Sequence, residues 1–330
     1  MDTTLRDGEQ TCGVSFLPHE KLRVAQLLLE ELLVDRIEIA SARVSEGEFE
    51  AAKNICRWAQ QKGFIERVEV LGFVDGKKSI DWIVRAGGKV INLLAKGSYR
   101  HCTGQLHKKP EEHFADVKAQ INLAQSNGLK VNLYLEDWSN GMKDNPEYVF
   151  QMVDALKDSG VSRFMLPDTL GVLNPLQCIE FLRKMVNRYP ELHFDFHAHN
   201  DYDLAVSNVL AAVLSGAKGL HTSVNGLGER AGNAPLASVQ AILKDHFHAH
   251  TNIDESKLRQ VSNVVESFSG IAIPPNKPIV GDSVFTQVAG VHADGDNKDG
   301  LYQNELLPER FGRKREYALG KSSGKANIRM

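Results

Sequence analysis

The feature that most restricts the fold of this chain is a regular alternation of short apolar, β-branched runs with longer helical patterns. We expect strands at 1–5, 35–40, 67–74, 89–95, 129–136, 161–167, 192–199 and 218–225. We expect the helices that follow them at 18–33, 46–62, 78–87, 110–127, 146–159, 175–188, 203–215 and 234–244. Eight strand–helix units in about 245 residues predict an α/β fold of the TIM (β/α)8 barrel type.

A doubly wound sheet is the alternative fold, because its strands and helices alternate in the same way. It is disfavoured, since no GxGxxG turn follows the first expected strand. We therefore assign residues 1–250 to a barrel. From residue 251 the sequence changes to a helical stretch (254–269), the proline-rich IAIPPNKPIVG and a polar, glycine-rich end with apolar anchors. We expect residues 251–330 to form an α-rich, irregular appendage to the barrel.

Composition narrows the class of protein. The chain has 330 residues, of which 42% are hydrophobic, which is enough for one large core or two smaller ones. The formal net charge is -3 with no long basic run, which argues against a nucleic-acid partner. The four cysteines show no CxxC spacing, and no apolar run approaches about 18 residues. With no signal peptide, these features predict a cytoplasmic protein with reduced thiols and no membrane partner.

Polar residues gather where the expected strands end, and barrel enzymes keep their chemistry at the carboxyl ends of the strands. These strand-end residues are Arg6, Asp7, Lys96, Tyr134, Glu136, Asp168, Thr169, His197, His199, Asn225, Glu229, Arg230 and Asn233. Because the carboxyl ends of parallel strands meet at one mouth, we expect many of these side chains to share a site. A non-catalytic binding barrel would leave this pattern unexplained.

Two histidines stand out in the stretch FDFHAHNDYD, residues 194–203. A strand repeats every two residues, so His197 and His199 point to one side. One reading makes one imidazole a hydrogen-bonded core group and the other a solvated one. With Asp7 at another strand end, the pattern favours a divalent metal site, for Mn²⁺ or Mg²⁺, with Zn²⁺ as an option. The lack of cysteine ligands argues against a closed structural zinc site.

Three further residues have a functional and a structural interpretation. Arg6 can hold an anionic oxygen beside the metal, or form a salt bridge at the barrel rim. Glu136 can serve in acid–base chemistry, or cap a helix as a rim carboxylate. Thr169 can bind substrate, or act as the N-cap of a helix.

Four motifs carry a resemblance to a known family. DTTLRDGEQT (2–11), LPDTLG (166–171), HAHNDYDLAVSN (197–208) and NGLGERAGNAPL (225–236) resemble the metal-dependent Claisen-condensing enzymes related to 2-isopropylmalate synthase. The resemblance covers essentially the whole chain. Within that family, LGFVDGKKSIDWI (71–83), YLEDWSNG (134–141) and LPERFGRKREYALGK (307–321) look closest to the citramalate-forming enzymes. Isopropylmalate-forming members usually carry a small serine where this chain has Tyr134.

The resemblance implies three kinds of site in this chain. The implied metal ligands are Asp7, His197, His199 and Asn233. The implied contacts to a 2-oxo acid are Arg6, Asp7, Leu71, Leu94, Tyr134 and Thr169. The implied contacts to acetyl-CoA are Leu94, Glu136, His292, Asp294, Leu301 and Tyr302.

The resemblance also implies a mechanism for an acyltransferase. Arg6 would stabilise the alkoxide on the keto oxygen, while Thr169 binds the carboxylate. His292, assisted by Glu136, would remove a methyl proton from acetyl-CoA, and the enolate would attack the ketone before thioester hydrolysis releases CoA. In the family, the segment matching GVHADGD (290–296) reaches into the neighbouring subunit, which implies a homodimer. Gly300 departs from the asparagine that citramalate-forming enzymes can have there.

Leu71, Leu94 and Tyr134, which the resemblance also marks, are bulky, so we expect pyruvate as the 2-oxo acid. The resemblance then implies (R)-citramalate as the product, in branched-chain amino-acid biosynthesis. Leu71 and Leu94 can also be ordinary core residues. The alternatives are 2-isopropylmalate or homocitrate synthesis, carbon–carbon cleavage by a lyase or aldolase, and a hydrolase, although hydrolases usually place HxH on the first strand. Related enzymes carry a C-terminal regulatory domain, which we expect to be absent from these 330 residues.

Overall fold

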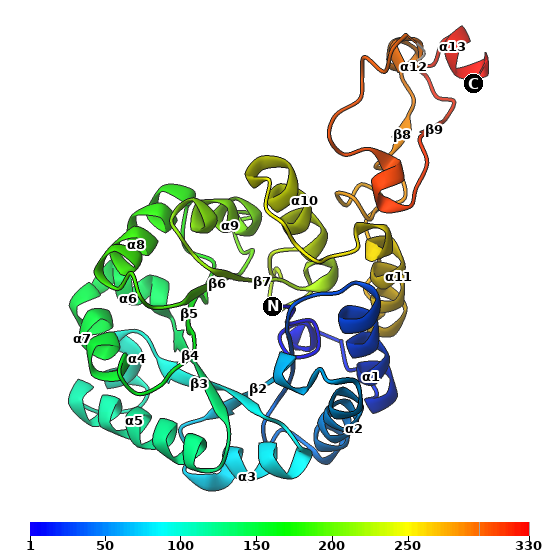
Figure 1. Ribbon diagram of the computed structural model, residues 1–330. Helices are drawn as coiled ribbons and strands as arrows, with labels where there is room; N and C mark the ends of the chain where they lie inside the picture. Colours follow the sequence, from blue (N-terminus) through cyan, green and yellow to red (C-terminus); the bar gives the residue numbers. More distant parts are fainter. Residues whose placement is uncertain (297, 330) are drawn as a thin grey trace.

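The inner wall of the molecule is a curled parallel sheet, seen end-on in Figure 1. The computed structural model describes residues 1–296 and 298–329. Over those residues the sheet pairs its strands in chain order. The strands are β1 Ile37–Ser41, β2 Val68–Phe73, β3 Val90–Lys96, β4 Lys130–Glu136, β5 Phe164–Asp168, β6 Phe194–Ala198 and β7 Gly219–His221. The predicted TIM barrel is therefore confirmed.

The barrel is closed by one residue rather than by the expected strand at 1–5. Asp2 bridges Ile37 of β1 on one side and Thr222 after β7 on the other. Immediately afterwards the carbonyl of Thr3 accepts the N–H groups of Arg6 and Asp7, so the chain turns. The prediction of a strand there was wrong because this tight turn takes up the backbone groups that a longer ladder would need. The turn brings Asp7 to the mouth of the barrel.

Helices surround the sheet (Figure 1). They are α1 Pro18–Gln26, continued by a π-helical turn at Leu27–Glu31, α2 Glu46–Lys62, α3 Lys77–Ala86, α5 Pro110–Ser126, α7 Pro146–Leu156, α8 Pro175–Arg188, α9 Ala205–Leu214 and α10 Leu236–Phe247. Local signals set their ends: Ser45 caps α2 by accepting the N–H of Glu48, and Gly63 ends it in the left-handed conformation. Proline occupies the first position of α1, α5, α7 and α8.

The prediction missed some short elements and overextended others. Two short helices, α4 Tyr99–Gly104 and α6 Trp138–Asp144, lie in the loops after β3 and β4. The strand expected at 218–225 is limited to β7, because a 3-10 turn, η4 Val224–Gly226, follows it with Asn225 in the left-handed region. The helix expected at 254–269 is a 3-10 turn, η5 Glu255–Lys257, followed by α11 Leu258–Ser269.

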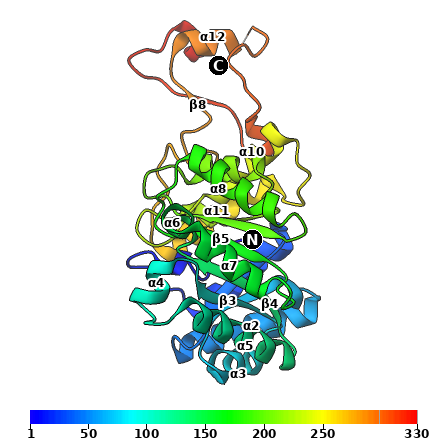
Figure 2. The ribbon, with the colours of Figure 1, turned by 90° about the vertical axis from the view of Figure 1, so that its left-hand side faces the viewer.

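The appendage begins beside the barrel and then leaves it. Helix α11 packs against α1, whereas the later segment extends away from the barrel, as both views show (Figures 1 and 2). That segment contains β8 Thr286–Gln287, α12 Gly290–Asp296, η6 Pro308–Phe311, β9 Glu316–Tyr317 and α13 Lys325–Arg329. Arg310 ties it to the barrel side through Glu255 and Asp245, with contacts of 2.6–2.7 Å.

Large apolar side chains are exposed on this segment. They include Val291, Leu301, Leu319 and Ile328. Apolar surface that gathers on one extended segment is typical of a protein–protein contact. Among the described residues, no helix is long and apolar enough to cross a membrane.

Candidate active site at the mouth of the barrel

A pocket of about 220 Å³ opens at the carboxyl ends of the strands. It brings together residues that are far apart in sequence but were predicted to share a site. These are Arg6, Asp7, Leu71, Leu94, Tyr134, Glu136, Thr169, His197 and His199. A larger cavity of about 580 Å³ lies at the opposite end of the barrel, near Met1 and Arg36. The smaller pocket is the better candidate because it lies at the carboxyl ends of the strands and holds Asp7, His197 and His199, which could share a metal ion.

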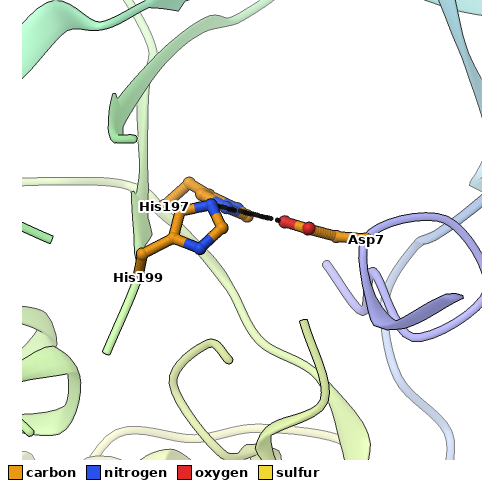
Figure 3. Close-up of side chains that lie close together, drawn as sticks. All are labelled: Asp7, His197 and His199. Atoms are coloured by element: carbon orange, nitrogen blue, oxygen red, sulfur yellow. Dashed lines mark hydrogen bonds and ion pairs between the residues drawn. The ribbon is translucent and has the colours of Figure 1, made fainter. Parts of the chain in front are cut away.

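The centre of the pocket is a cluster of Asp7, His197 and His199, shown in Figure 3. Oδ2 of Asp7 lies 3.0 Å from Nε2 of His197 and 3.7 Å from Nε2 of His199. The two Nε2 atoms are 3.3 Å apart. All three side chains are buried, and one ligand atom from each falls within 4.8 Å of the others. This geometry suits three ligands that share one metal ion.

The orphaned polar atoms of the cluster also fit a metal. Within the described residues, neither carboxylate oxygen of Asp7 accepts a hydrogen bond of good geometry, although Oδ2 lies only 3.0 Å from Nε2 of His197. Buried polar groups are normally satisfied. An ion bound between the facing oxygen and Nε2 atoms would satisfy the carboxylate.

The electrostatics of the cluster leave its groups ready to bind a cation. Burial alone would raise the pKa of Asp7, but the charge of Arg6 and the neighbouring histidines hold that pKa well below its usual range. Burial, with His197 beside it, lowers the pKa of His199 to about 3. An anionic carboxylate and a neutral imidazole are the forms that bind metal.

Asn233 lies next to the cluster. Its backbone forms an antiparallel bridge with His199, and its side chain is buried. Both polar atoms of this carboxamide have no hydrogen-bond partner in the part of the chain that the structure describes. Gly228 leaves room for it, because a Cβ at Gly228 would lie 2.8 Å from Cγ of Asn233. The role of Asn233 as a fourth ligand stays a prediction.

Arg6 reaches from the turn after Asp2 into the barrel. Its Nε donates to Oε2 of Glu38 over 2.6 Å, and its Nη2 donates to the Tyr134 hydroxyl over 3.4 Å. Its Nη1 lies 3.7 Å from Oδ2 of Asp7. The guanidinium is therefore held beside the metal cluster by a buried carboxylate rather than by an exposed salt bridge at the rim.

Glu136 and Thr169 lie at the ends of β4 and β5. The carboxylate of Glu136 pairs with Nζ of Lys96, at the end of β3. Oγ1 of Thr169 accepts the N–H of Asp137 over 2.9 Å, which leaves its hydroxyl hydrogen free to donate. Thr169 is not the cap of the following helix, because Asn174 occupies that position on α8.

The residues predicted from the GVHADGD segment do not line this pocket in their own chain. His292 and Asp294 lie on α12, and the ring of His292 lies against that of Tyr302, with centroids 4.3 Å apart and the ring planes tilted by 34°. Asp294 pairs with Lys298 at 2.6 Å. Leu301 and Tyr302 are exposed. The predicted contribution of these residues to a partner subunit's site stays a prediction.

Sequence reasoning did not single out several buried polar residues beneath the pocket. They are Glu38, Asn92, Asn132, Asp195 and His221, all at most 1% exposed. The signal was present for four of them, since each interrupts an apolar strand such as IEIAS or FDFHA, whereas His221 ends the short strand β7. Their mutual contacts could not be read from any one strand.

A family model described as HMGL-like matches residues 1–265. A "Putative (R)-citramalate synthase" of Methanopyrus kandleri is 36% identical over 99% of this chain and 63% of that protein. The homocitrate synthase of Sulfolobus acidocaldarius is 36% identical over 100% of this chain and 69% of its own length. A "Probable 2-isopropylmalate synthase" of Ignicoccus hospitalis is also 36% identical, over 99% of this chain and 80% of that protein.

The chain thus spans slightly less than two thirds of the Methanopyrus protein. Among solved structures, the HMG-CoA lyase of Bacillus subtilis superposes with a TM-score of 0.71. The superposition covers 83% of this chain and 94% of the lyase, and the two sequences are 23% identical. At that identity the match supports the fold alone.

Proposed function

The chain belongs to the HMGL-like family, and from this premise we propose that it condenses acetyl-CoA with a 2-oxo acid, preferring pyruvate and forming (R)-citramalate. The observation that carries the proposal is the Asp7–His197–His199 cluster in a pocket with a bulky apolar wall. Relatives named for citramalate, homocitrate and isopropylmalate synthesis are all equally identical to this chain. Overall sequence identity therefore does not distinguish the three possible substrates. We use the residues of the pocket wall to distinguish them.

Asp7, His197 and His199, with Asn233 beside them, are the residues that would hold a divalent cation. A bound Mn²⁺ or Mg²⁺ would supply Lewis-acid polarisation of the substrate's keto group. Arg6 would stabilise the negative charge that develops on the keto oxygen as the new carbon–carbon bond forms. The free hydroxyl hydrogen of Thr169 would bind the 2-oxo acid's carboxylate.

The proton chemistry requires a base near the methyl group of acetyl-CoA. We assign this role to His292, with Glu136 assisting from the pocket. His292 would take the methyl proton, and the resulting enolate would attack the keto carbon to give an alkoxide, which is then protonated to the hydroxyl of the product. Water then hydrolyses the thioester to a carboxylate and releases CoA as a thiol with one proton. Because α12 lies away from its own barrel (Figures 1 and 2), this assignment requires a homodimer in which each appendage serves the other barrel.

The exposed apolar residues of the appendage support the same assembly. Leu301 and Leu319 are 70% and 71% exposed, and a partner barrel would cover such surface. The contacts proposed for acetyl-CoA are Leu94, Glu136, His292, Asp294, Leu301 and Tyr302. They come from the barrel of one subunit and the appendage of the other.

We base the substrate preference on the apolar wall beside the metal cluster, where the Tyr134 ring lies edge-on to His197. Leu71, Tyr134 and Met165 form a small buried cluster, and Phe73 and Leu94 pack against it. Adjacent strands hold the wall in register, with Phe73 beside Leu94 and Leu94 beside Tyr134. We infer that this wall leaves room for the methyl group of pyruvate. Forcing the isopropyl group of 2-oxoisovalerate into it costs about 1–3 kcal/mol.

Widening this wall is expected to change the substrate preference. In Leu71→Ala or Tyr134→Ser, kcat/KM for 2-oxoisovalerate relative to pyruvate should rise by roughly 5-fold to 150-fold, which corresponds to the same 1–3 kcal/mol. The measurement is steady-state kinetics with both acids. Leu170→Ala, an exposed position outside the pocket lining, is the matched control. An unchanged ratio in both pocket variants would show that these residues do not define the substrate site.

Gly228 provides a second prediction. In Gly228→Ala the new methyl group would meet the Asn233 side chain at about 2.8 Å and displace it. If Asn233 helps to hold the ion, Mn²⁺ affinity should fall roughly 10- to 100-fold, as for other changes that disturb the support of a metal site. Titration calorimetry with Mn²⁺ measures this. Gly47→Ala, where the nearest atom lies 3.8 Å from the added Cβ, should leave the affinity unchanged.

The test of the function itself is CoA release from acetyl-CoA, followed by a thiol reagent. The protein is supplied with Mn²⁺ and assayed separately with pyruvate, 2-oxoisovalerate, 2-oxoglutarate and oxaloacetate. The highest kcat/KM is expected with pyruvate. A preference for 2-oxoisovalerate would replace the citramalate assignment with isopropylmalate synthesis, and one for 2-oxoglutarate would replace it with homocitrate synthesis. Absence of CoA release with all four would reject condensation.

A further inference from the structure

A chain of buried polar side chains runs beneath the metal cluster, inside the barrel. His221, on β7, places its Nδ1 3.1 Å from the hydroxyl of Tyr134. Its Nε2 lies 3.1 Å from Oδ2 of Asp195, on β6. His221 is 1% exposed and Asp195 is 0% exposed. Neither residue has a part in the mechanism described above.

The direction of these hydrogen bonds follows from what each group can donate. Asp195 forms an ion pair with Arg36 at 2.6 Å, so its carboxylate only accepts. A neutral imidazole has one N–H, which must therefore sit on Nε2 and point at Asp195. Nδ1 is left as an acceptor for the hydroxyl hydrogen of Tyr134.

The hydroxyl of Tyr134 has competing neighbours. Oε2 of Glu38 lies 3.4 Å from it, and Nη2 of Arg6 lies 3.4 Å away as a donor. His221 offers the shortest of the three contacts, at 3.1 Å. The imidazole ring also stands edge-on to the Tyr134 ring, with centroids 5.6 Å apart and an interplanar angle of 81°. His221 therefore holds both the hydroxyl and the ring of Tyr134.

We propose that Asp195 and His221 form a positioning pair that fixes the Tyr134 ring, and thereby the size of the 2-oxo acid pocket. This inference rests on the proposed function, since it names what sets the substrate preference of the same site. Asp195 fixes the tautomer of His221, and His221 fixes the hydroxyl of Tyr134. Without the pair, the hydroxyl turns to Glu38 and the ring no longer holds one position in the wall shared with Leu71 and Leu94.

A double-mutant cycle tests the pair. His221→Phe keeps an aromatic ring but removes both hydrogen bonds, and Tyr134→Phe removes only the hydroxyl. Each single variant should raise kcat/KM for 2-oxoisovalerate relative to pyruvate by about fivefold, as expected for one lost hydrogen bond. The double variant should show no further rise, because the two residues act through one contact. The effect should fall on KM for pyruvate more than on kcat.

Two controls separate positioning from general destabilisation. His193→Gln changes a residue on the other side of Asp195, 2.8 Å from its Oδ1, and should leave the substrate ratio unchanged. Mn²⁺ affinity should be the same in every variant. Where His221→Phe does not fold, His221→Gln replaces it, since its amide cannot span both partners as the imidazole does.

A crystal structure of the His221 variant makes the test independent of turnover. A displaced or disordered Tyr134 ring is the expected result. An unmoved ring, additive effects in the double variant, or an equal shift in His193→Gln would each overturn the proposal. Failure of the wild-type protein to release CoA with any 2-oxo acid would instead reject the proposed function, while the variant structure would still report on the positioning of Tyr134.

Discussion

Replacement of His197 or His199 by alanine is expected to abolish CoA release, and so is removal of divalent metal by a chelator. Each change takes one of three converging ligands from a buried cluster, or the ion itself. The loss of charge stabilisation on the keto oxygen is worth several kcal/mol, so activity should fall by on the order of a thousandfold or more. Added Mn²⁺ or Mg²⁺ should restore the stripped wild-type protein but neither variant.

The measurement combines CoA release with metal content determined on the same samples. His246→Ala is the matched control, because it removes an exposed histidine from the last turn of α10. It should retain both metal and activity. Full activity in chelator-treated His199→Ala protein would rule out a catalytic metal at this cluster.

The second large effect concerns the assembly of the site. Arg6→Ala and His292→Ala should each lose about 100-fold to 10,000-fold of the activity, the range for removal of an oxyanion donor or a general base. If α12 of one subunit serves the other's barrel, a mixed dimer contains one intact site and one that carries both changes. Random mixing of equal amounts should then restore about a quarter of wild-type activity, because half the dimers are mixed.

Co-expression with two different affinity tags isolates the mixed dimer for this measurement. Arg6 supports Glu38, which is 0% exposed, so Arg6→Ala can also perturb folding. His199→Ala, paired with His292→Ala, gives the same complementation without that contact. An isolated mixed dimer with no activity above its parents would place His292 in the site of its own chain, or remove it from the mechanism.

The prediction from sequence was most successful where structure is determined by neighbours along the chain. The helices expected at 46–62, 110–127 and 175–188 lie close to where their sequence pattern put them. In the structure their ends are set by neighbours along the chain, such as the caps at Ser45 and Gly63 and the prolines that open four helices. The same reasoning located Asp7, His197 and His199. Each ends or follows a strand, and parallel strands direct their carboxyl ends to one mouth.

The closure of the barrel at Asp2 and the contacts around the pocket could not be predicted from the sequence, because they depend on tertiary structure. Residues 1–5 read as a strand, yet only Asp2 pairs, because the turn at Thr3 follows at once. The close fit of Gly228 against Asn233 and the contacts among Tyr134, His221 and Asp195 join segments that are distant in sequence.

What the sequence determined by itself was therefore the alternation of elements and the identity of the strand-end residues, since both follow from local periodicity and from the common direction of the strands. Only the tertiary structure decided which polar atoms face one another across the barrel and where α12 lies relative to its own pocket. The physical reason is that buried contacts between strands depend on register and on the path of long connections. Those are set by the packing of the whole barrel, which no single stretch of residues encodes.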